Sequence, residues 1–533
     1  MQKYHIMESK PRYYTAGMAD FENIRSRNCI YVDKTDLIYR LVNESQYVFL
    51  SRPRRFGKSL LCNTLKSYFE GKKELFEGLA IAELESEWKR YPVFKFDISA
   101  CKNQANIEGI IDELGLQLSR FEERYGRNDK ENTIGKRFKG ILERAHRQTG
   151  LPCVVIIDEY DSVLLEHLYD DRLPEVRRIL QEFYQVLKIA ESDLRFVFIT
   201  GITKFSQLSI FSTINNLTNI SMDSQYAAIC GFTKEEVLDV FREDIEALAL
   251  RYRCPFDEMV VMLRQQYDGY HFSDESPDVF NPFSITNVFK SKRLDYYWFS
   301  SGTPTFLFET MKRYNTQLLS LPQLAVTSSQ FDVPTEGMES ALPLLYQSGY
   351  LTIKDYDFCE RVYTLDFPNA EVKVGFLESF MGSVMGVHNC DTQGWANRIY
   401  VGLLRNDFEK AMNALQSCFK SIPYLDHGNR ILDSLANYEA YYEVITYIVF
   451  SMINCRTYTQ VKNATGRTDC VVHLKDAIIV MEMKLDGTSD EALCQIDGKG
   501  YMIPYQTEGK RVVKVGISFS SETKTVEEWK VKE

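Results

Sequence analysis

A basic turn between an apolar run and a helical pattern constrains the fold of this chain more than any other feature. The apolar residues YVFL (47–50) predict a short buried strand, and apolar residues recur at helical spacing over residues 60–69. Between them lies SRPRRFGKS (51–59), which places Gly-Lys-Ser at the start of the helix. A strand, a tight turn and Gly-Lys-Ser opening a helix is the layout of a phosphate-binding loop.

The physical reason for this layout lies in the start of the helix. Backbone N–H groups there face a polyphosphate, and the helix dipole favours the anion. We expect Lys58 to reach the terminal phosphates and the Ser59 hydroxyl to ligate Mg²⁺. Arg52 stands five residues before Gly57, where the pattern expects its first glycine. The match is therefore incomplete, and a bare Gly-Lys-Ser often occurs by chance.

A second anchor is the run CVVIIDE (153–159), which predicts a central parallel strand buried on both faces. The paired acids at its end emerge where such sheets bind ligands. Asp158 is suited to the Mg²⁺ shell, and Glu159 to polarising an attacking water. A strand that ends in a solvated acidic turn explains the run equally well by itself. Its position about 100 residues after Gly-Lys-Ser favours an ATPase.

A further strand is predicted over residues 194–200, beside the acidic strand. In ATPases of this topology, a polar residue at the end of that strand contacts the γ-phosphate or the water. Thr200, Thr203 and Lys204 are the candidates, and the sequence does not choose among them. A strand followed by a capped turn is the alternative for each. Strands that alternate with helices in this way predict a parallel sheet covered on both faces.

Two further cations lie in the loop. We expect Arg54 and Arg55 either to add charge at the phosphates or to serve a neighbouring subunit of a homo-oligomer as an arginine finger does. A solvated basic loop is equally consistent with the sequence. The predicted nucleotide-binding residues are Arg54, Arg55, Phe56, Gly57, Lys58, Ser59, Asp158 and Thr203, with Glu159 as the catalytic residue.

The C-terminal hundred residues hold a separate set of elements. They are an apolar helix (438–450), two adjacent strands (466–473 and 477–484) and a short helix (489–496). The polar residues that they carry are Glu443, Asp469, Glu482, Lys484 and Gln495.

The spacing Asp…Glu-x-Lys is what metal-dependent phosphodiester cleavage requires. Glu482 and Lys484 alternate along a strand and so share a face. Asp469 and Glu482, helped by Glu443, supply oxygen ligands for Mg²⁺. Lys484 then positions or activates the metal-bound water, and Gln495 approaches from the side. The alternative is a surface ion pair on an edge strand, which for Glu-x-Lys alone would be the better explanation. The predicted metal ligands are Ser59 and Asp158 at one site and Glu443, Asp469 and Glu482 at the other.

Composition limits the class of protein. At 533 residues the chain should divide into two to four domains. The net charge of −11 argues against a general nucleic-acid binder, so any such contact must come from a local patch. No run approaches the roughly 18 apolar residues of a membrane span, and the first residues lack the apolar core of a signal peptide. The 12 cysteines include no Cys-x-x-Cys pair, which favours a reducing cytoplasm.

Several of these segments together resemble a known family. The chain is similar to bacterial proteins that join an AAA-ATPase-like domain to a C-terminal nuclease-like domain of the PD-(D/E)xK superfamily. The similarity lies in residues 31–35, 52–59, 157–161 and 200–206, and then in 466–469, 482–484 and 495–501. Arg-Pro-Arg-Arg-Phe-Gly-Lys-Ser is typical of that family, so the missing glycine supports membership. The resemblance implies an ATPase coupled to a nuclease fold and names no substrate.

We therefore expect an α/β protein of three parts. They are a P-loop domain with a parallel sheet (1–230), a mostly helical middle region (231–437) and a restriction-endonuclease-like α/β domain (438–533). ATP and Mg²⁺ are the expected cofactors, nucleic acid is the expected partner with DNA favoured over RNA, and the nucleotide state is expected to gate cleavage. The alternative is a nucleotide-dependent switch whose nuclease fold docks a partner without cleavage.

Overall fold

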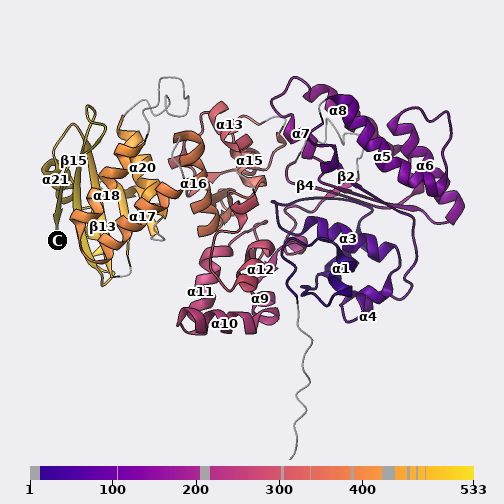
Figure 1. The fold of residues 1–533 in the computed structure, drawn as a ribbon, viewed down its shortest axis with the longest axis horizontal. Coiled ribbons are helices and arrows are strands. Elements are labelled where there is room, and N and C mark those ends of the chain that lie inside the picture. The colour runs from indigo at the N-terminus through magenta and orange to yellow at the C-terminus, as the bar shows by residue number, and fades with distance from the viewer. Residues whose placement is uncertain are drawn as a thin grey trace, which may run out of the picture. The chain divides into compact units, whose positions relative to one another are not determined.

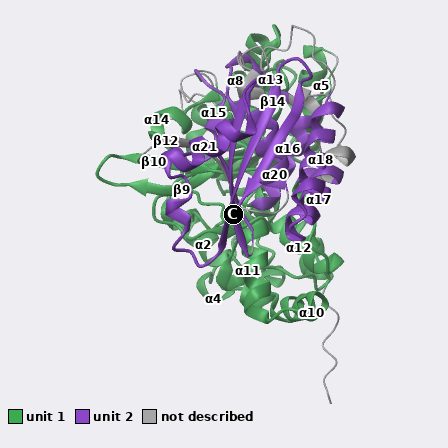
Figure 2. Ribbon diagram, turned by 90° about the vertical axis from the view of Figure 1, so that its left-hand side faces the viewer, with its two compact units in different colours: residues 1–298, 325–338, 342–369 green, residues 299–324, 339–341, 370–533 purple. Residues whose placement is uncertain are grey.

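The computed structural model describes residues 13–104, 106–204, 216–301, 305–335, 338–385, 389–422, 438–452, 456–463, 466–474 and 476–533. The chain forms two compact units, which Figure 2 shows in different colours. Unit 1 comprises residues 1–298, 325–338 and 342–369, and unit 2 comprises residues 299–324, 339–341 and 370–533. The residues of the predicted middle region are thus divided between the two units.

A five-stranded parallel sheet organises the first part of unit 1. Its strands, in spatial order, are β2 (Val93–Asp97), β3 (Cys153–Asp158), β4 (Leu194–Gly201), β1 (Tyr47–Ser51) and β5 (Leu217–Asn219). Strand β4 thus separates the strand before the basic turn from the strand that ends in the paired acids. Leu50 pairs with Thr200 and Ile157 with Ile199, so the carboxyl ends of all three strands meet at one edge.

Helices cover both faces of this sheet, as its mostly apolar and buried central strands require (Figure 1). Helices α5, α6 and α8 lie over one face, and α1, α3 and α4 lie over the other. The helices of this part are α1 (Phe21–Ser26), α2 (Thr35–Glu44), α3 (Lys58–Phe69), α4 (Ile81–Leu84), α5 (Ile107–Tyr125), α6 (Ile134–Thr149), α7 (Ser162–Glu166) and α8 (Leu173–Ile189). The strands predicted over residues 47–50, 153–159 and 194–200 and the helix predicted over residues 60–69 are confirmed.

The pattern changes to helices after residue 231, as the sequence predicts. The elements are β6 (Phe232–Thr233), α9 (Lys234–Val240), α10 (Arg242–Tyr252), α11 (Phe256–Tyr267), β7 (Val279–Phe280) and α12 (Pro282–Ser291). Thr233 and Glu236 form a capping box at the start of α9. The four helices share a core that includes Phe241, Leu263 and Phe289, and Val32 from the N-terminal part packs into it.

A helix and a hairpin close unit 1. The elements are β8 (Leu324–Val326), α14 (Ser328–Phe331), α15 (Leu342–Gln347), β9 (Thr352–Asp357) and β10 (Val362–Asp366), of which Leu324 alone falls in unit 2. Strands β9 and β10 pair antiparallel and form a hairpin.

Unit 2 combines helices with a mixed sheet in the order β11-β12-β13-β14-β15. Its elements are α13 (Thr305–Arg313), α16 (Ala370–Met385), α17 (Asn389–Leu404), α18 (Phe408–Ser421), α20 (Tyr438–Met452), β11 (Arg456–Asn463), β12 (Gly466–His473), β13 (Ala477–Leu485), α21 (Ser489–Lys499), β14 (Arg511–Ser520) and β15 (Thr525–Lys532). Only β13 and β14 pair parallel, and the helix α21 that connects them crosses the sheet.

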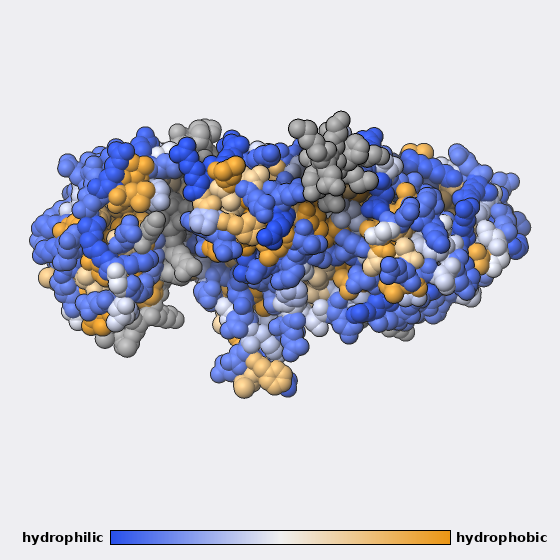
Figure 3. Space-filling view, turned by 90° about the horizontal axis from the view of Figure 1, so that it is seen from below, coloured by the Kyte–Doolittle hydropathy of each residue, from blue (hydrophilic) through white to orange (hydrophobic). Residues whose placement is uncertain are grey.

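The fold class is therefore mixed α/β, as the sequence predicts, with a parallel N-terminal sheet, many helices in the middle and a mixed C-terminal sheet. Among the described residues, none of the helices is both long and apolar enough to cross a bilayer. Hydrophilic residues predominate on the face drawn in Figure 3, and hydrophobic ones show in separate groups.

Candidate functional site

The basic turn between β1 and α3 forms a tight loop closed by its own lysine. Gly57 immediately precedes the helix as its N-cap, with φ +92°, a backbone conformation that favours glycine. Lys58 is buried, and its Nζ donates to the carbonyl oxygens of Arg52 at 3.0 Å and of Pro53 at 3.1 Å. The ammonium group is thus held inside the turn.

Asp158 lies beside this turn, at the end of β3. The Ser59 side chain is near enough to lower the pKa of this carboxyl, and only 3% of Asp158 is exposed. Oδ1 is buried and has no hydrogen-bond partner among the described residues. Burial, and then the charge of Glu159, raise the pKa of Asp158. A hydroxyl, an unpaired carboxylate oxygen and a nearby second acid fit a hard divalent cation, which would compensate that charge.

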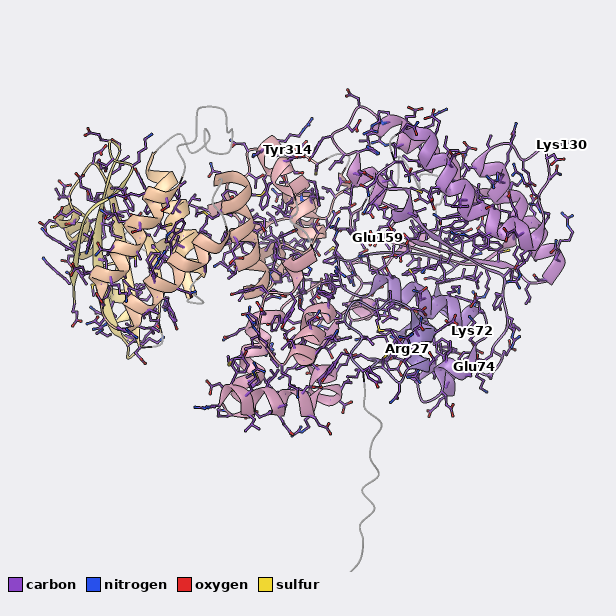
Figure 4. All side chains as sticks on the ribbon, in the orientation of Figure 1. Arg27, Lys72, Glu74, Lys130, Glu159 and Tyr314 are labelled. Atoms are coloured by element: carbon purple, nitrogen blue, oxygen red, sulfur yellow. The ribbon has the colours of Figure 1, made fainter. Side chains whose placement is uncertain are left out.

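Glu159 follows Asp158 in a left-handed conformation, with φ +54°. The neighbouring Tyr160 donates its N–H to Thr200 O, which binds this bend to β4. Figure 4 labels Glu159 at one end of the strands of the parallel sheet. The two acids predicted from the run CVVIIDE therefore reach the same sheet edge as the loop that contains Lys58.

The three polar candidates at the end of β4 all have partners within the protein. Thr200 Oγ1 donates to Leu50 O at 2.7 Å, and the Lys204 ammonium pairs with the Asp332 carboxylate. Thr203 donates its N–H and its hydroxyl to Asp161 Oδ2, at 2.6 and 2.7 Å. A contact between Thr203 and a phosphate stays a prediction. Residues 205 and 206, at the end of the similar segment, lie outside the described residues.

The other predicted members of the loop divide into two kinds. Arg54 and Arg55 are exposed, and the Arg55 guanidinium lies 4.4 Å from the ring centroid of Phe283. Phe56 is buried instead, and its ring contacts those of Tyr270 and Phe272 edge to face. The side chain of Phe56 is therefore part of an aromatic core beneath the loop.

In unit 2 the side chains of β13 and α21 form a hydrogen-bonded group. Lys484 Nζ donates to Gln495 Oε1 at 2.5 Å and lies 3.4 Å from Glu482 Oε1. Gln495 Nε2 donates to the same Glu482 oxygen. Glu482 is 1% exposed, and its Oε2 has no hydrogen-bond partner among the described residues. The structure thus brings together three residues that the sequence placed on two different elements.

Asp469 approaches this group from β12. The ladder between β12 and β13 pairs Cys470 with Met481, and just beyond it Asp469 Oδ2 accepts the N–H of Met483 at 2.8 Å. Burial, and then the charge of Asp469, raise the pKa of Glu482 to about 7. Asp469 and Glu482 fit a divalent cation, because Glu482 Oε2 is buried and unpaired and the cation would offset both the burial and the repulsion between the two carboxylates.

Glu443 is buried in α20. Burial, and then the charges of Asp469 and Glu443, raise the pKa of the Cys470 thiol, and Lys373 of α16 opposes them. The Lys373 ammonium also lies 5.1 Å from the ring centroid of Tyr447. Within the described part of the chain, no three His, Cys, Asp or Glu side chains stand close enough to hold one metal ion. Glu443 therefore does not complete a three-carboxylate site here, and its role as a ligand stays a prediction.

Sequence reasoning did not single out three residues at these sites. Asp161 binds the turn after β4, Arg52 anchors the start of the basic loop, and Lys373 contributes charge from a helix outside the predicted nuclease-like domain. Asp161 was only one acid in a run, and Arg52 was a departure from a pattern. For Lys373 the sequence held no signal, because its neighbours are distant in the chain.

Comparison with known proteins agrees with this geometry. Residues 15–211 match the family described as "Predicted AAA-ATPase", and residues 437–529 match the PD-(D/E)XK nuclease superfamily. A protein of Azotobacter chroococcum mcd 1, described as "Uncharacterized protein in vnfD 5'region", is 32% identical over 518 residues, or 96% of this chain and 97% of that relative. The chain belongs to this family of AAA-ATPase-like proteins with a C-terminal PD-(D/E)XK domain. The family predicted from the motifs is thereby confirmed.

Proposed function

We propose that this AAA-ATPase-like protein binds and hydrolyses ATP in unit 1, and that its nucleotide state controls metal-dependent cleavage of nucleic acid by unit 2. One observation carries the proposal. Each unit places a buried carboxylate with an unpaired oxygen beside a lysine, Asp158 with Lys58 and Glu482 with Lys484. Phosphate chemistry requires these two groups together, a carboxylate for the metal and a cation for the phosphate or the water.

At the first site, Lys58 binds the terminal phosphates and the N–H groups that follow Gly57 cradle them. Ser59 and Asp158 would hold Mg²⁺, which would neutralise phosphate charge. Glu159 accepts the proton of the attacking water and orients it. Arg54 and Arg55 are exposed beside the loop and add positive charge for the nucleotide or for a neighbouring subunit.

At the second site, Asp469 and Glu482 would hold Mg²⁺, which would supply a nucleophilic water and neutralise charge on the phosphate. Lys484 orients that water and stabilises negative charge on the phosphate oxygens. Gln495 restrains both neighbours, since its amide donates to Glu482 and accepts from Lys484. Glu443, like Asp469, adds negative charge near the Cys470 thiol.

The first test concerns ATP. Lys58→Ala is expected to lower kcat/KM for ATP hydrolysis by about 100-fold or more, because it removes the cation that binds the transferred phosphate. Lys66→Ala is the matched control, since Lys66 lies on the same helix and pairs only with surface glutamates. An unchanged rate in Lys58→Ala would remove the assignment of this loop.

The second test concerns cleavage. The protein is incubated with plasmid DNA, linear DNA and RNA, with Mg²⁺ or Mn²⁺, in the presence and absence of ATP. Lys484→Ala is expected to abolish cleavage. Lys530 is a surface lysine of β15, and Lys530→Ala is expected to cleave as the wild type does. ATP, and not a nonhydrolysable analogue, is expected to change the cleavage rate of the wild type.

One observation favours a second function, that of a nucleotide-dependent module that docks nucleic acid without cutting it. Glu443, Asp469 and Glu482 do not form a three-carboxylate metal cluster in the described structure. Binding of DNA without cleavage under any of the conditions above would support this function over the first.

A further inference from the structure

Arg52 occupies the position where the phosphate-loop pattern has its first glycine, and it is 1% exposed. Its Nη1 donates to Ser51 O at 3.0 Å and to Ser221 O at 2.7 Å. Its Nη2 donates at 3.4 Å to the carbonyls of Tyr226 and Ala227. No ion pair with a carboxylate of the described residues accompanies these bonds. The guanidinium is thus bound almost entirely by main-chain oxygens.

An aromatic ring completes this environment. The guanidinium carbon lies 4.1 Å from the ring centroid of Phe272, within the range of a cation–π interaction. The ring of Phe272 in turn contacts that of Phe56, inside the loop itself. Burial lowers the pKa of Arg52 to about 10, so the side chain is still charged at neutral pH. A buried cation is costly unless it is hydrogen-bonded. These contacts supply bonds to both Nη atoms, whereas Nε has no partner among the described residues.

The main chain of Arg52 makes two further hydrogen bonds, one to β4 and one to Lys58. Its N–H donates to Gly201 O at 3.2 Å, which extends the pairing between β1 and β4. Its carbonyl oxygen accepts the hydrogen bond from Lys58 Nζ. Arg52 is therefore fixed to β4 by its N–H, to residues 221–227 by its side chain, and to the phosphate-binding lysine by its carbonyl.

We propose that Arg52 is a positioning residue of the nucleotide site. Its guanidinium fastens the start of the loop to residues 221–227 and to Phe272, and this sets the carbonyl oxygens that direct Lys58 toward the phosphates. A glycine at this position would supply neither the anchor nor the charge beneath the loop. The inference rests on the proposed binding of ATP by Lys58, and it explains why the chain departs from the common pattern.

The test compares nucleotides that differ only in their phosphates. Arg52→Met retains an unbranched aliphatic stem and removes the charge and the donors. Arg52→Lys keeps the charge and N–H donors but loses the planar guanidinium fork. Arg25→Met is the control, because Arg25 also donates to two main-chain oxygens, those of Leu75 and Glu77, in the same unit. Dissociation constants for ATP and AMP are measured by titration on the full-length protein, together with kcat and KM for ATP hydrolysis and the thermal midpoint.

Arg52→Met is expected to weaken ATP binding by about 10- to 100-fold, the range for losing hydrogen bonds from a charged group. AMP binding should change far less, because AMP lacks the terminal phosphates that Lys58 reaches. Arg52→Lys is expected to bind ATP more tightly than Arg52→Met but less tightly than the wild type. Arg25→Met is expected to bind both nucleotides as the wild type does. A purely structural role would reduce the competent fraction for both nucleotides and leave the ratio of their affinities unchanged.

An unchanged ratio of ATP to AMP affinity in folded Arg52→Met overturns the inference. If that variant does not fold, Phe272→Leu replaces it, with an expected loss of ATP affinity of about threefold and the same ratio as the criterion. A wild type that binds no ATP would overturn the proposed function itself. A wild type that binds ATP, with variants that bind it equally well, would overturn the role of Arg52 alone.

Discussion

At the scale of the residue, Asp161 joins the acidic end of β3 to the turn after β4. Its Oδ2 accepts the N–H groups of Ile202 and Thr203 and the Thr203 hydroxyl, and the residue is fully buried. Burial, and then the charge of Glu159, raise its pKa. Because all the donors belong to one turn, this carboxylate fixes the turn relative to Glu159.

Asp161→Ala is therefore expected to lower the free energy of unfolding by about 2–4 kcal/mol, since it leaves buried donors without an acceptor. Urea denaturation followed by circular dichroism measures this change. Asp170→Ala is the control, because Asp170 is bound by Arg172 only two residues away at the surface. A midpoint for Asp161→Ala equal to that of the control would contradict the role given to Asp161. The rate of ATP hydrolysis should fall together with the stability.

The residues that the sequence predicted at the nucleotide site are those whose chemistry is encoded locally. Lys58 and Ser59 follow a strand within a few residues, and Asp158 ends an apolar run. Arg52 could not be interpreted in this way, because the oxygens that it binds lie 169 and 175 residues further along the chain. Only the fold brings residues 221–227 to the start of the loop.

At the scale of the element, α21 decides the geometry of the second site because it carries Gln495. The helix packs on β14 at Gly516, where a Cβ would collide with Ser489 O and lie 3.0 Å from Leu493 Cγ. The helical pattern predicted α21, and the alternation of β13 predicted that Glu482 and Lys484 share a face. The close approach at Gly516 was not predictable, since it depends on which helix crosses that strand.

Gly516→Ala is expected to push α21 away from the sheet and to reduce cleavage by about tenfold or more, through misplacement of Gln495. Gly498→Ala, on the same helix, is the matched control. Nothing lies within 4 Å of a Cβ at Gly498, and alanine there should stabilise the helix by about 0.5–1 kcal/mol. Cleavage kinetics and thermal midpoints are measured for both variants. Equal cleavage rates in the two variants would show that cleavage does not depend on the position of α21.

At the scale of the whole molecule, the nuclease-like sheet shares its core with helices that precede the matched segment. Phe419 of α18 packs against the rings of Tyr442 and Phe519, and Tyr442 stacks on Phe519. Gln416, on the same helix, donates to Val526 O at 2.8 Å in the edge strand β15. The sequence placed its boundary at residue 438 because the chemical residues begin there, but apolar packing extends to the earlier helices of unit 2.

A fragment of residues 438–533 is therefore expected to lack a cooperative unfolding transition, whereas residues 370–533 retain one. The short fragment leaves Phe519 and Tyr442 without Phe419, and loss of a buried phenylalanine costs about 3–5 kcal/mol, a large part of the stability of a small domain. Urea denaturation of both fragments measures the difference, and Phe419→Ala in the longer fragment isolates the contribution of this one contact. If the short fragment unfolded cooperatively at the same urea concentration as the long one, α18 would be a covering helix without a part in the core. Loss of the transition in the short fragment, with a lowered midpoint in Phe419→Ala, would instead make helices α16 to α18 part of the folding unit on which the geometry of Glu482 and Lys484 depends.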